Sequence, residues 1–211
     1  MFKKIIFIIV SSIIILYIIL FSPLPSLILK TILETKIERS YKADIEFENF
    51  TFKVLKGLKI DRITFNKDNF RLTTEKAILN PKSISLLKKK IVIDCYIEEV
   101  NLKGKGFFVI LDILSEVSDV PSLSTLNFDY VKMDIFIDKG FISFKNIEAI
   151  GKKSKISGDI IRDYKKTDYN IDLYIPKEAT KDIPVFTKKL LDINDEGEWS
   201  KINIDVSVSN K

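Results

Sequence analysis

The stretch IEFENFTF, residues 45–52, begins as an alternating strand and then changes phase. Its first two apolar residues are separated by one polar residue, whereas Phe47 and Phe50 are separated by two, Glu48 and Asn49. Side chains alternate between the two faces of a strand, so one inserted residue reverses the face of all that follow. A β-bulge absorbs the inserted residue and restores the face. The stretch therefore predicts a bulged strand with all its apolar side chains on one side.

The same spacing, apolar-x-apolar-x-x-apolar-x-apolar, recurs in LKIDRITF (58–65), CYIEEVNL (95–102) and ISFKNIEA (142–149). Because a bulge bends its strand, several bulges in register would curl a sheet around its apolar face. The pattern predicts a curved antiparallel sheet, an open groove or half-barrel that is apolar inside and charged outside. An ordinary β-sandwich with bulged edge strands is the alternative. The groove is favoured because no opposing sheet or large helical layer is apparent.

The candidate lining of the groove consists of the larger apolar side chains of the four segments and of Ile93, which precedes the segment 95–102 on the same apolar phase. They are Ile45, Phe47, Phe50, Phe52, Leu58, Ile60, Ile63, Phe65, Ile93, Cys95, Ile97, Val100, Leu102, Ile142, Phe144 and Ile147. An apolar face of this size, if left uncovered, is a binding surface.

Strand-like segments follow one another after residue 42, separated by short turns. They cover 43–54, 57–66, 70–79, 90–103, 126–138, 140–150, 153–161, 168–175 and 199–209. Two breaks, 107–120 and 183–195, have helical character, with Phe186, Leu190 and Ile193 as the apolar stripe of the second. No Gly/Ser-rich linker divides the chain, so we expect residues 43–211 to form one β-rich domain.

An uncharged run, residues 5–21, follows Lys3 and Lys4 at the N-terminus. As a helix of about 17 residues it would extend roughly 26 Å, at the short end of what spans a bilayer. A cleaved signal peptide is the alternative, but its apolar core is usually shorter and ends at a small-x-small site, which FSPLPS lacks. Residues 1–22 are therefore predicted to be a transmembrane anchor, with the basic flank inside and the body outside the cytoplasm.

Residues 23–42 show the spacing of an amphipathic juxtamembrane helix, with Leu29, Ile32, Leu33 and Ile37 as its apolar positions. Such a helix can lie in the headgroup region of the membrane, cap the open end of a sheet, or pack on the core. The sequence leaves these three possibilities open.

The composition gives no support to several kinds of chemistry. The chain has no histidine, the commonest general base and metal ligand, and none of the familiar nucleotide, hydrolase or metal motifs. The net charge of +5 is modest and no basic stripe with interleaved aromatics occurs, so we expect no nucleic-acid binding. Cys95 lies on the apolar phase of its segment and is expected to be a buried small hydrophobe. We therefore expect a protein that is not an enzyme, with no catalytic residues, metal or cofactor.

Three segments carry a resemblance to a known family: EKAILNPKSISLLKKKIVIDCYIEEVNLKG (75–104), VKMDIFIDKGFISFKNIEA (131–149) with a turn glycine at Gly140, and KISGDI (155–160). With the N-terminal anchor and helix, they make the chain resemble the AsmA-like proteins of bacterial envelopes, within the bridge-like lipid-transfer group. The resemblance implies a groove that shields acyl chains, held at the bacterial inner membrane with the body in the periplasm. It implies no catalytic residues.

The sequence thus leads to two expectations of function. The first is a membrane-anchored protein that binds or transfers phospholipid or another acyl-chain lipid. The second is a structural or assembly component of an envelope secretion or export complex, in which a sheet edge pairs with a protein partner. Nine strands at about 4.8 Å each span roughly 45 Å, so we do not expect the groove to cross an envelope alone.

Overall fold

The computed structural model describes residues 24–53, 56–85, 89–104, 125–139 and 141–209. The anchor predicted for residues 1–22 and the helix predicted for 107–120 lie outside these ranges. Within them, no helix is both long enough and apolar enough to cross a membrane.

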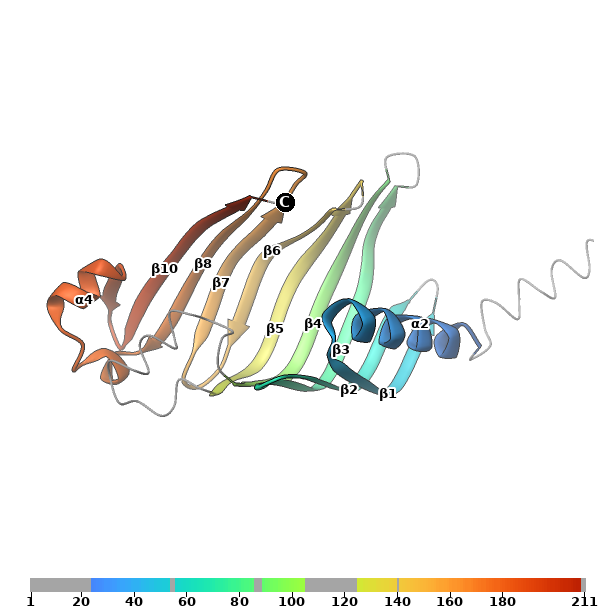
Figure 1. Cartoon of the computed structure of the whole chain (residues 1–211), viewed down its shortest axis with the longest axis horizontal. Coiled ribbons are helices and arrows are strands. Elements are labelled where there is room, and N and C mark those ends of the chain that lie inside the picture. Colours follow the sequence, from blue (N-terminus) through green and yellow to red (C-terminus); the bar gives the residue numbers. More distant parts are fainter. Residues whose placement is uncertain (1–23, 54–55, 86–88, 105–124, 140, 210–211) are drawn as a thin grey trace, which may run out of the picture.

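The described chain is mainly β, as predicted, and its strands form one open antiparallel sheet (Figure 1). Strands β1 to β8 are neighbours in chain order, followed by β10 and then β9 at the far edge. The strands are β1 (Asp44–Lys53), β2 (Gly57–Lys67), β3 (Phe70–Ser85), β4 (Lys90–Lys103), β5 (Thr125–Asp138), β6 (Phe141–Ile150), β7 (Lys155–Arg162), β8 (Lys166–Pro176), β9 (Ile193–Glu196) and β10 (Trp199–Ser209). No second sheet faces this one among the described residues, which contradicts the β-sandwich alternative.

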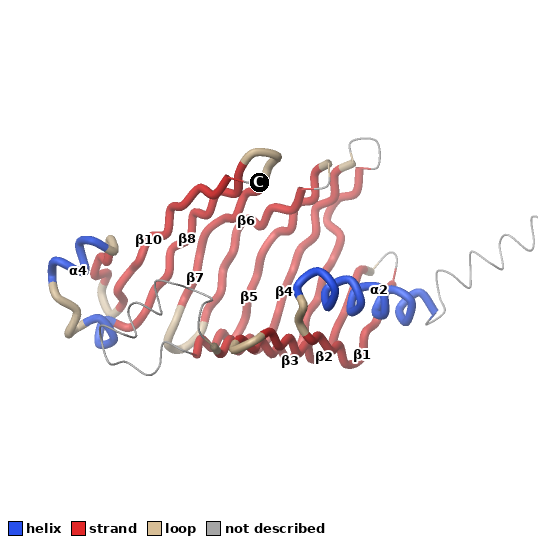
Figure 2. The backbone as a smooth tube through the Cα atoms, in the orientation of Figure 1, coloured by secondary structure: helices blue, strands red, loops and turns tan. Residues whose placement is uncertain are grey.

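The helices lie at the two ends of the sheet (Figure 2). Helix α2 (Leu24–Tyr41) confirms the helix predicted for 23–42 and runs along β1. At the other end lie the 3-10 helix η2 (Lys177–Thr180) and helix α4 (Val185–Leu190). The broad middle of the sheet therefore has no helix of the described chain over it.

The prediction of helix over 183–195 is wrong in its second half. Helix α4 ends at Leu190, and Asp192 takes a left-handed φ of 49°, which turns the chain back. The following residues form β9, where Ile193 is buried. The supposed helical stripe does not exist, because Phe186 and Leu190 are 77% and 73% exposed.

The predicted phase changes are confirmed, and each has the same backbone cause. The second polar residue of each pair has a left-handed φ: 33° at Asn49, 52° at Arg62, 50° at Glu99 and 53° at Asn146. A non-glycine residue in this region is uncommon, and here it marks the position at which each strand changes phase. The four segments therefore share one local conformation.

The phase changes of β1 to β5 lie in one line across the sheet. Register pairs join the polar elbows in series: Glu48 to Asp61, Asp61 to Lys76, Lys76 to Glu98, and Glu98 to Tyr130. Because neighbouring strands insert their extra residue at matching positions, β4 keeps an unshifted register with both neighbours there. In β6 the extra residue has no counterpart, and the register shifts against both β5 and β7.

Candidate functional site

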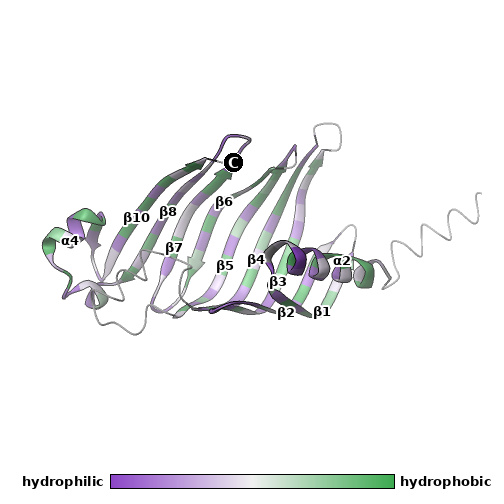
Figure 3. Ribbon diagram, viewed as in Figure 1, coloured by the Kyte–Doolittle hydropathy of each residue, from purple (hydrophilic) through white to green (hydrophobic). Residues whose placement is uncertain are grey.

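One row of apolar side chains crosses the whole sheet. Each member is the register partner of the next, from β1 to β10 and on to β9. The row is Phe50, Ile60, Ala77, Ile97, Val131, Ala149, Ile156, Leu173, Ile202 and Ile193. We call this the central row and the side of the sheet that carries it the apolar face. Figure 3 shows the alternation of apolar and polar residues along the strands.

The register places all the predicted lining residues on the apolar face. On one side of the phase change, Ile45 pairs with Phe65 and Phe47 pairs with Ile63. Because β1 and β2 both change phase between these pairs and the central row, these side chains lie on the same side of the sheet as the central row. Across the bulge, Phe52 pairs with Leu58. The remaining predicted residues reach the same face through these pairs: Cys95 with Met133, Val100 with Phe128, Leu102 with Leu126, Ile93 with Ile135, Phe144 with Ile135, Ile142 with Ile137, and Ile147 with Gly158.

Six of the ten strands, β3, β5, β7, β8, β9 and β10, carry none of the predicted lining residues. In β3, Leu72, Thr74, Ala77 and Leu79 have the same spacing, but a threonine and an alanine stand at two of the apolar positions. In β5 the segment LNFDYVKM, residues 126–133, fits the pattern without exception, and its recurrence could have been found. Strands β7, β8 and β10 alternate without a bulge, so only their register shows that they continue the face.

The side chains of the apolar face become less buried along the strands, from the central row toward the β3–β4 and β5–β6 turns. In the central row Leu173 and Ile202 have no exposed surface, and Ala77 is 1% exposed. Near the β3–β4 and β5–β6 turns, a row of four isoleucines crosses the sheet by register: Ile84, Ile91, Ile137 and Ile142. Its end members are Ile84, 56% exposed, and Ile142, 45% exposed. We call these four residues the isoleucine row.

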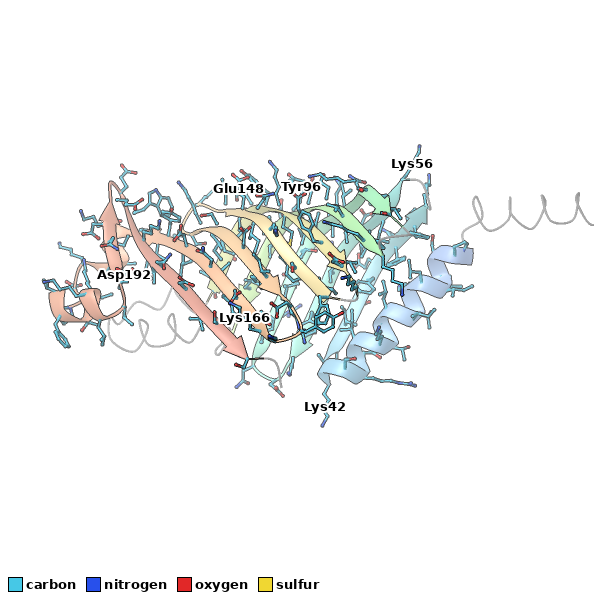
Figure 4. All side chains as sticks on the ribbon, turned by 90° about the horizontal axis from the view of Figure 1, so that it is seen from above. Lys42, Lys56, Tyr96, Glu148, Lys166 and Asp192 are labelled. Carbon is cyan, nitrogen blue, oxygen red and sulfur yellow. The ribbon has the colours of Figure 1, made fainter. Side chains whose placement is uncertain are left out.

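The opposite face of the sheet is charged, and its ion pairs join neighbouring strands. Arg62 bonds Glu48 at 3.0 Å, which links the elbows of the β1 and β2 bulges. Lys76 bonds Glu98 at 3.1 Å, and Lys82 contacts both Asp94 and Asp134. Figure 4, which looks along the sheet, shows side chains on both sides of the strands. One face is thus apolar and the other is solvated.

A shallow hollow of about 280 Å³ lies mainly on the charged face. Its aromatic walls are Tyr174 and Trp199, and Lys155 Nζ lies 4.3 Å from the centre of the Trp199 ring. A cation–π interaction between Lys155 and Trp199 and the packing of the indole ring account for the shape of this hollow.

The carboxylates of Glu98 and Asp195 have structural partners. Glu98 is paired with Lys76, and Asp195 accepts a hydrogen bond from Ser200 Oγ at 2.7 Å. The Ser200 hydroxyl also contacts Thr180 Oγ1 at 2.6 Å, and both hydroxyl residues are fully buried, so this network ties η2 to β10. No group of three or more metal-ligating side chains occurs in the part of the chain that the structure describes.

Cys95 is buried on the apolar face, as expected, at 4% exposure. Burial, with a smaller effect of the Asp94 charge, raises the pKa of its thiol to about 11. A thiol with this pKa is protonated at neutral pH and is a poor nucleophile. Cys95 therefore serves as a small packing residue.

Comparison of the chain with family models, with curated proteins and with solved structures finds no match.

Proposed function

We propose that the protein binds an acyl-chain lipid, such as a phospholipid, on its apolar face. The observation that carries this proposal is the apolar face of the open sheet. Its central row is an unbroken line of apolar side chains across the described strands, and its isoleucine row leaves Ile84 and Ile142 56% and 45% exposed. The curvature expected from repeated bulges would make that face an apolar groove, and acyl chains are the ligands that such a groove suits.

The exposed part of the apolar face supports the same proposal. Soluble proteins rarely leave contiguous apolar surface open to water without a partner for it. The isoleucine row and Val206 and Val208, 47% and 49% exposed, all lie on this face, toward the same end of the strands. A bound acyl chain would cover these side chains and remove their surface from water.

The AsmA-like resemblance belongs to the same proposal. A protein of that kind would be held at the bacterial inner membrane by residues 1–22 and would present its sheet in the periplasm. Helix α2 follows this segment directly and leaves Leu27, Ile28 and Ile32 between 55% and 63% exposed, away from β1. Apolar side chains at this place suit a helix that lies against a membrane surface.

The test is the lipid content of the full chain purified in mild detergent, measured by mass spectrometry of extracted lipid per mole of protein. Ile84→Asp places a carboxylate on the apolar face at a position already 56% exposed, so the fold is expected to survive. Ser83→Asp, its neighbour on the charged face, is the matched control. We expect the lipid content to fall at least about fivefold in Ile84→Asp, about 1 kcal/mol of binding free energy, and to stay unchanged in Ser83→Asp.

Two results would reject the proposal. One is a wild-type protein that carries no lipid after mild extraction. The other is an equal lipid content in Ile84→Asp and Ser83→Asp, both with the wild-type melting temperature, since the apolar face would then have no part in loading.

A second candidate function, an assembly component that pairs through its sheet edge, is favoured by one observation. Among the described residues, strand β10 has a neighbouring strand on its outer side only along Trp199–Ile202.

A further inference from the structure

The backbone groups at the two edges of the sheet are covered in different ways. At the first edge, α2 takes the place of a neighbouring strand. The Ser26 hydroxyl accepts a hydrogen bond from Phe52 N at 2.9 Å and lies 3.2 Å from Phe52 O, and Glu34 Oε1 accepts one from Phe47 N at 3.3 Å. At the last edge, β9 pairs with β10 over four residues only. Edge strands without cover are sites of pairing with other chains.

The open part of β10 is residues 203–209. The two-residue turn at 197–198 makes Glu196 and Trp199 a hydrogen-bonded pair, so odd-numbered residues of β10 direct their N–H and C=O groups to the β9 side. Beyond β9, these are the backbone groups of Asn203, Asp205, Ser207 and Ser209. No strand of the described chain pairs with them on that side.

We propose that a second copy of this chain occupies the open edge, with its β10 antiparallel to the first about a two-fold axis at Val206. In this register Val206 lies opposite Val206 of the second copy, and Asp205 lies opposite Ser207 of the second copy. Odd-numbered residues then face odd-numbered residues, so the outward N–H and C=O groups of both copies bond each other. Stretch 203–209 is thereby fully paired.

Charge selects this register over its neighbour. A shift by two residues that keeps the hydrogen bonds would place Asp205 opposite Asp205 of the second copy, and like charges directly opposite are destabilising. The opposite shift leaves only residues 205–209 paired among the described residues of the two copies. Strand β9 pairs with β10 only as far as Ile202, so it leaves residues 203–209 of β10 open to the second copy.

The symmetry also sets the size and shape of the assembly. A two-fold axis perpendicular to the sheet keeps both apolar faces on the same side, so the combined sheet is continuous. Both α2 helices then lie at its outer ends and close them, which makes the assembly a closed dimer and not a filament. At about 4.8 Å per strand the joined sheet extends roughly 90 Å. The pairing does not depend on a bound lipid.

Disulfide formation between equivalent positions tests the axis directly. In a Cys95→Ala background of the full chain in mild detergent, Val206→Cys places two sulfurs on a non-hydrogen-bonded pair, with Cα atoms about 4.5 Å apart, which suits a disulfide. Ser207→Cys is the matched control. In the proposed register Ser207 of one copy lies diagonally across from Ser207 of the other, about 7–8 Å away, which is beyond the range of a disulfide. We expect oxidation to link Val206→Cys at least about tenfold faster than Ser207→Cys.

Removal of one outward N–H tests the edge. Asp205→Pro deletes a donor that no strand of the described chain uses, whereas Asp205→Ala removes the same carboxylate and keeps the N–H. We expect a dimeric mass for the wild type and Asp205→Ala, and a monomeric mass for Asp205→Pro, by light scattering corrected for detergent.

Three results would overturn the proposal: a monomeric wild type at the concentrations used, equal linking of the two cysteine variants, or a dimer that survives in Asp205→Pro. Lipid content per chain, measured alongside, separates this inference from the proposed function. A monomer that carries lipid rejects only the dimer, and a dimer without lipid rejects only the lipid site.

Discussion

Asp159 Oδ1 accepts a hydrogen bond from the backbone N of Asn146 at 2.7 Å, and this bond fixes the bulge of β6. Asn146 is the inserted residue, with φ of 53°, and its side chain donates to Asp134 Oδ2 at 2.8 Å. The bulge is thus held from both neighbouring strands, β5 and β7. It stands where the register of β6 shifts against each of them.

Asp159→Ala should destabilise the protein, because the Asn146 N–H loses its acceptor at a position that no ladder bond can satisfy. We expect a loss of about 1 kcal/mol in the free energy of unfolding, measured by urea denaturation. Asp44→Ala, an exposed aspartate at the start of β1, is the control and should change it by less than about 0.5 kcal/mol. Equal effects of the two substitutions would show that the bond does not hold the bulge.

Glu99→Gly should be neutral or stabilising, since glycine adopts a φ of 50° without strain. Glu99→Val should cost about 1–2 kcal/mol, because a β-branched residue is strongly disfavoured at this φ. Asn101→Val, also exposed and two residues along β4, provides the comparison at an extended position. Thermal melting of the three variants checks the order, and Glu99→Val as stable as Asn101→Val would contradict the left-handed assignment.

Ser26→Ala should loosen α2 from the edge of the sheet. Phe52 N then loses the acceptor that substitutes for a neighbouring strand, at a cost of about 1–2 kcal/mol. Thr31→Ala removes only an exposed hydroxyl bond within the helix and is the matched control. Hydrogen exchange at the Phe52 amide is the sharper measurement, and its protection should fall in Ser26→Ala alone.

Cys95 should resist thiol reagents in the folded protein. A pKa near 11 leaves about a hundredfold less thiolate at pH 8 than the ordinary value of 9.0 would give. Because the pKa of the Cys95 thiol is higher in the folded state, the protonated thiol contributes its full stability to the folded protein below the unfolded pKa. This contribution is lost as the pH rises through about 11. Iodoacetamide labelling at pH 8 with and without urea checks this, and fast labelling of the folded chain would contradict it.

Asp134 should contribute to acid unfolding. The hydrogen bond from Lys82, with a second from Asn146, lowers the pKa of its carboxyl below the usual value. The stabilisation is therefore present above the unfolded pKa, near 3.8, and is lost as pH falls through the lower folded value. The melting temperature of the wild type should exceed that of Asp134→Asn at pH 7, and the difference should shrink below pH 4. A constant difference would contradict the prediction.

Much of this fold follows from local sequence pattern. The period of two located all the long strands, and the doubled polar residue located the phase changes at Asn49, Arg62, Glu99 and Asn146. The pattern succeeds there because each bulge needs only one inserted residue and a solvated elbow. Strand β9 was missed because four residues are too few to show a period, and its hydrophobic signal is Ile193 alone.

Long-range relationships could not be predicted in the same way. The continuity of the apolar face through β7, β8 and β10 depends on register, which no single strand encodes. The phase change of β3 was hidden because Thr74 and Ala77, although buried, are weak as apolar signals. The place of α2 could not be predicted from its sequence. It depends on bonds from Ser26 and Glu34 to the backbone of β1 and on the packing of Leu33 and Ile37 against the cluster of Phe47, Ile60 and Ala77.

The line of matched phase changes across β1 to β5 makes each strand a repeat unit in a one-dimensional array. Consecutive strands are neighbours, so each of these described strands pairs with the strand before it and the strand after it. A hairpin with the same spacing could be inserted or removed between two strands without changing the face or the bend of the others. The length of this sheet is therefore an adjustable quantity, set by the number of hairpins and independent of its cross-section.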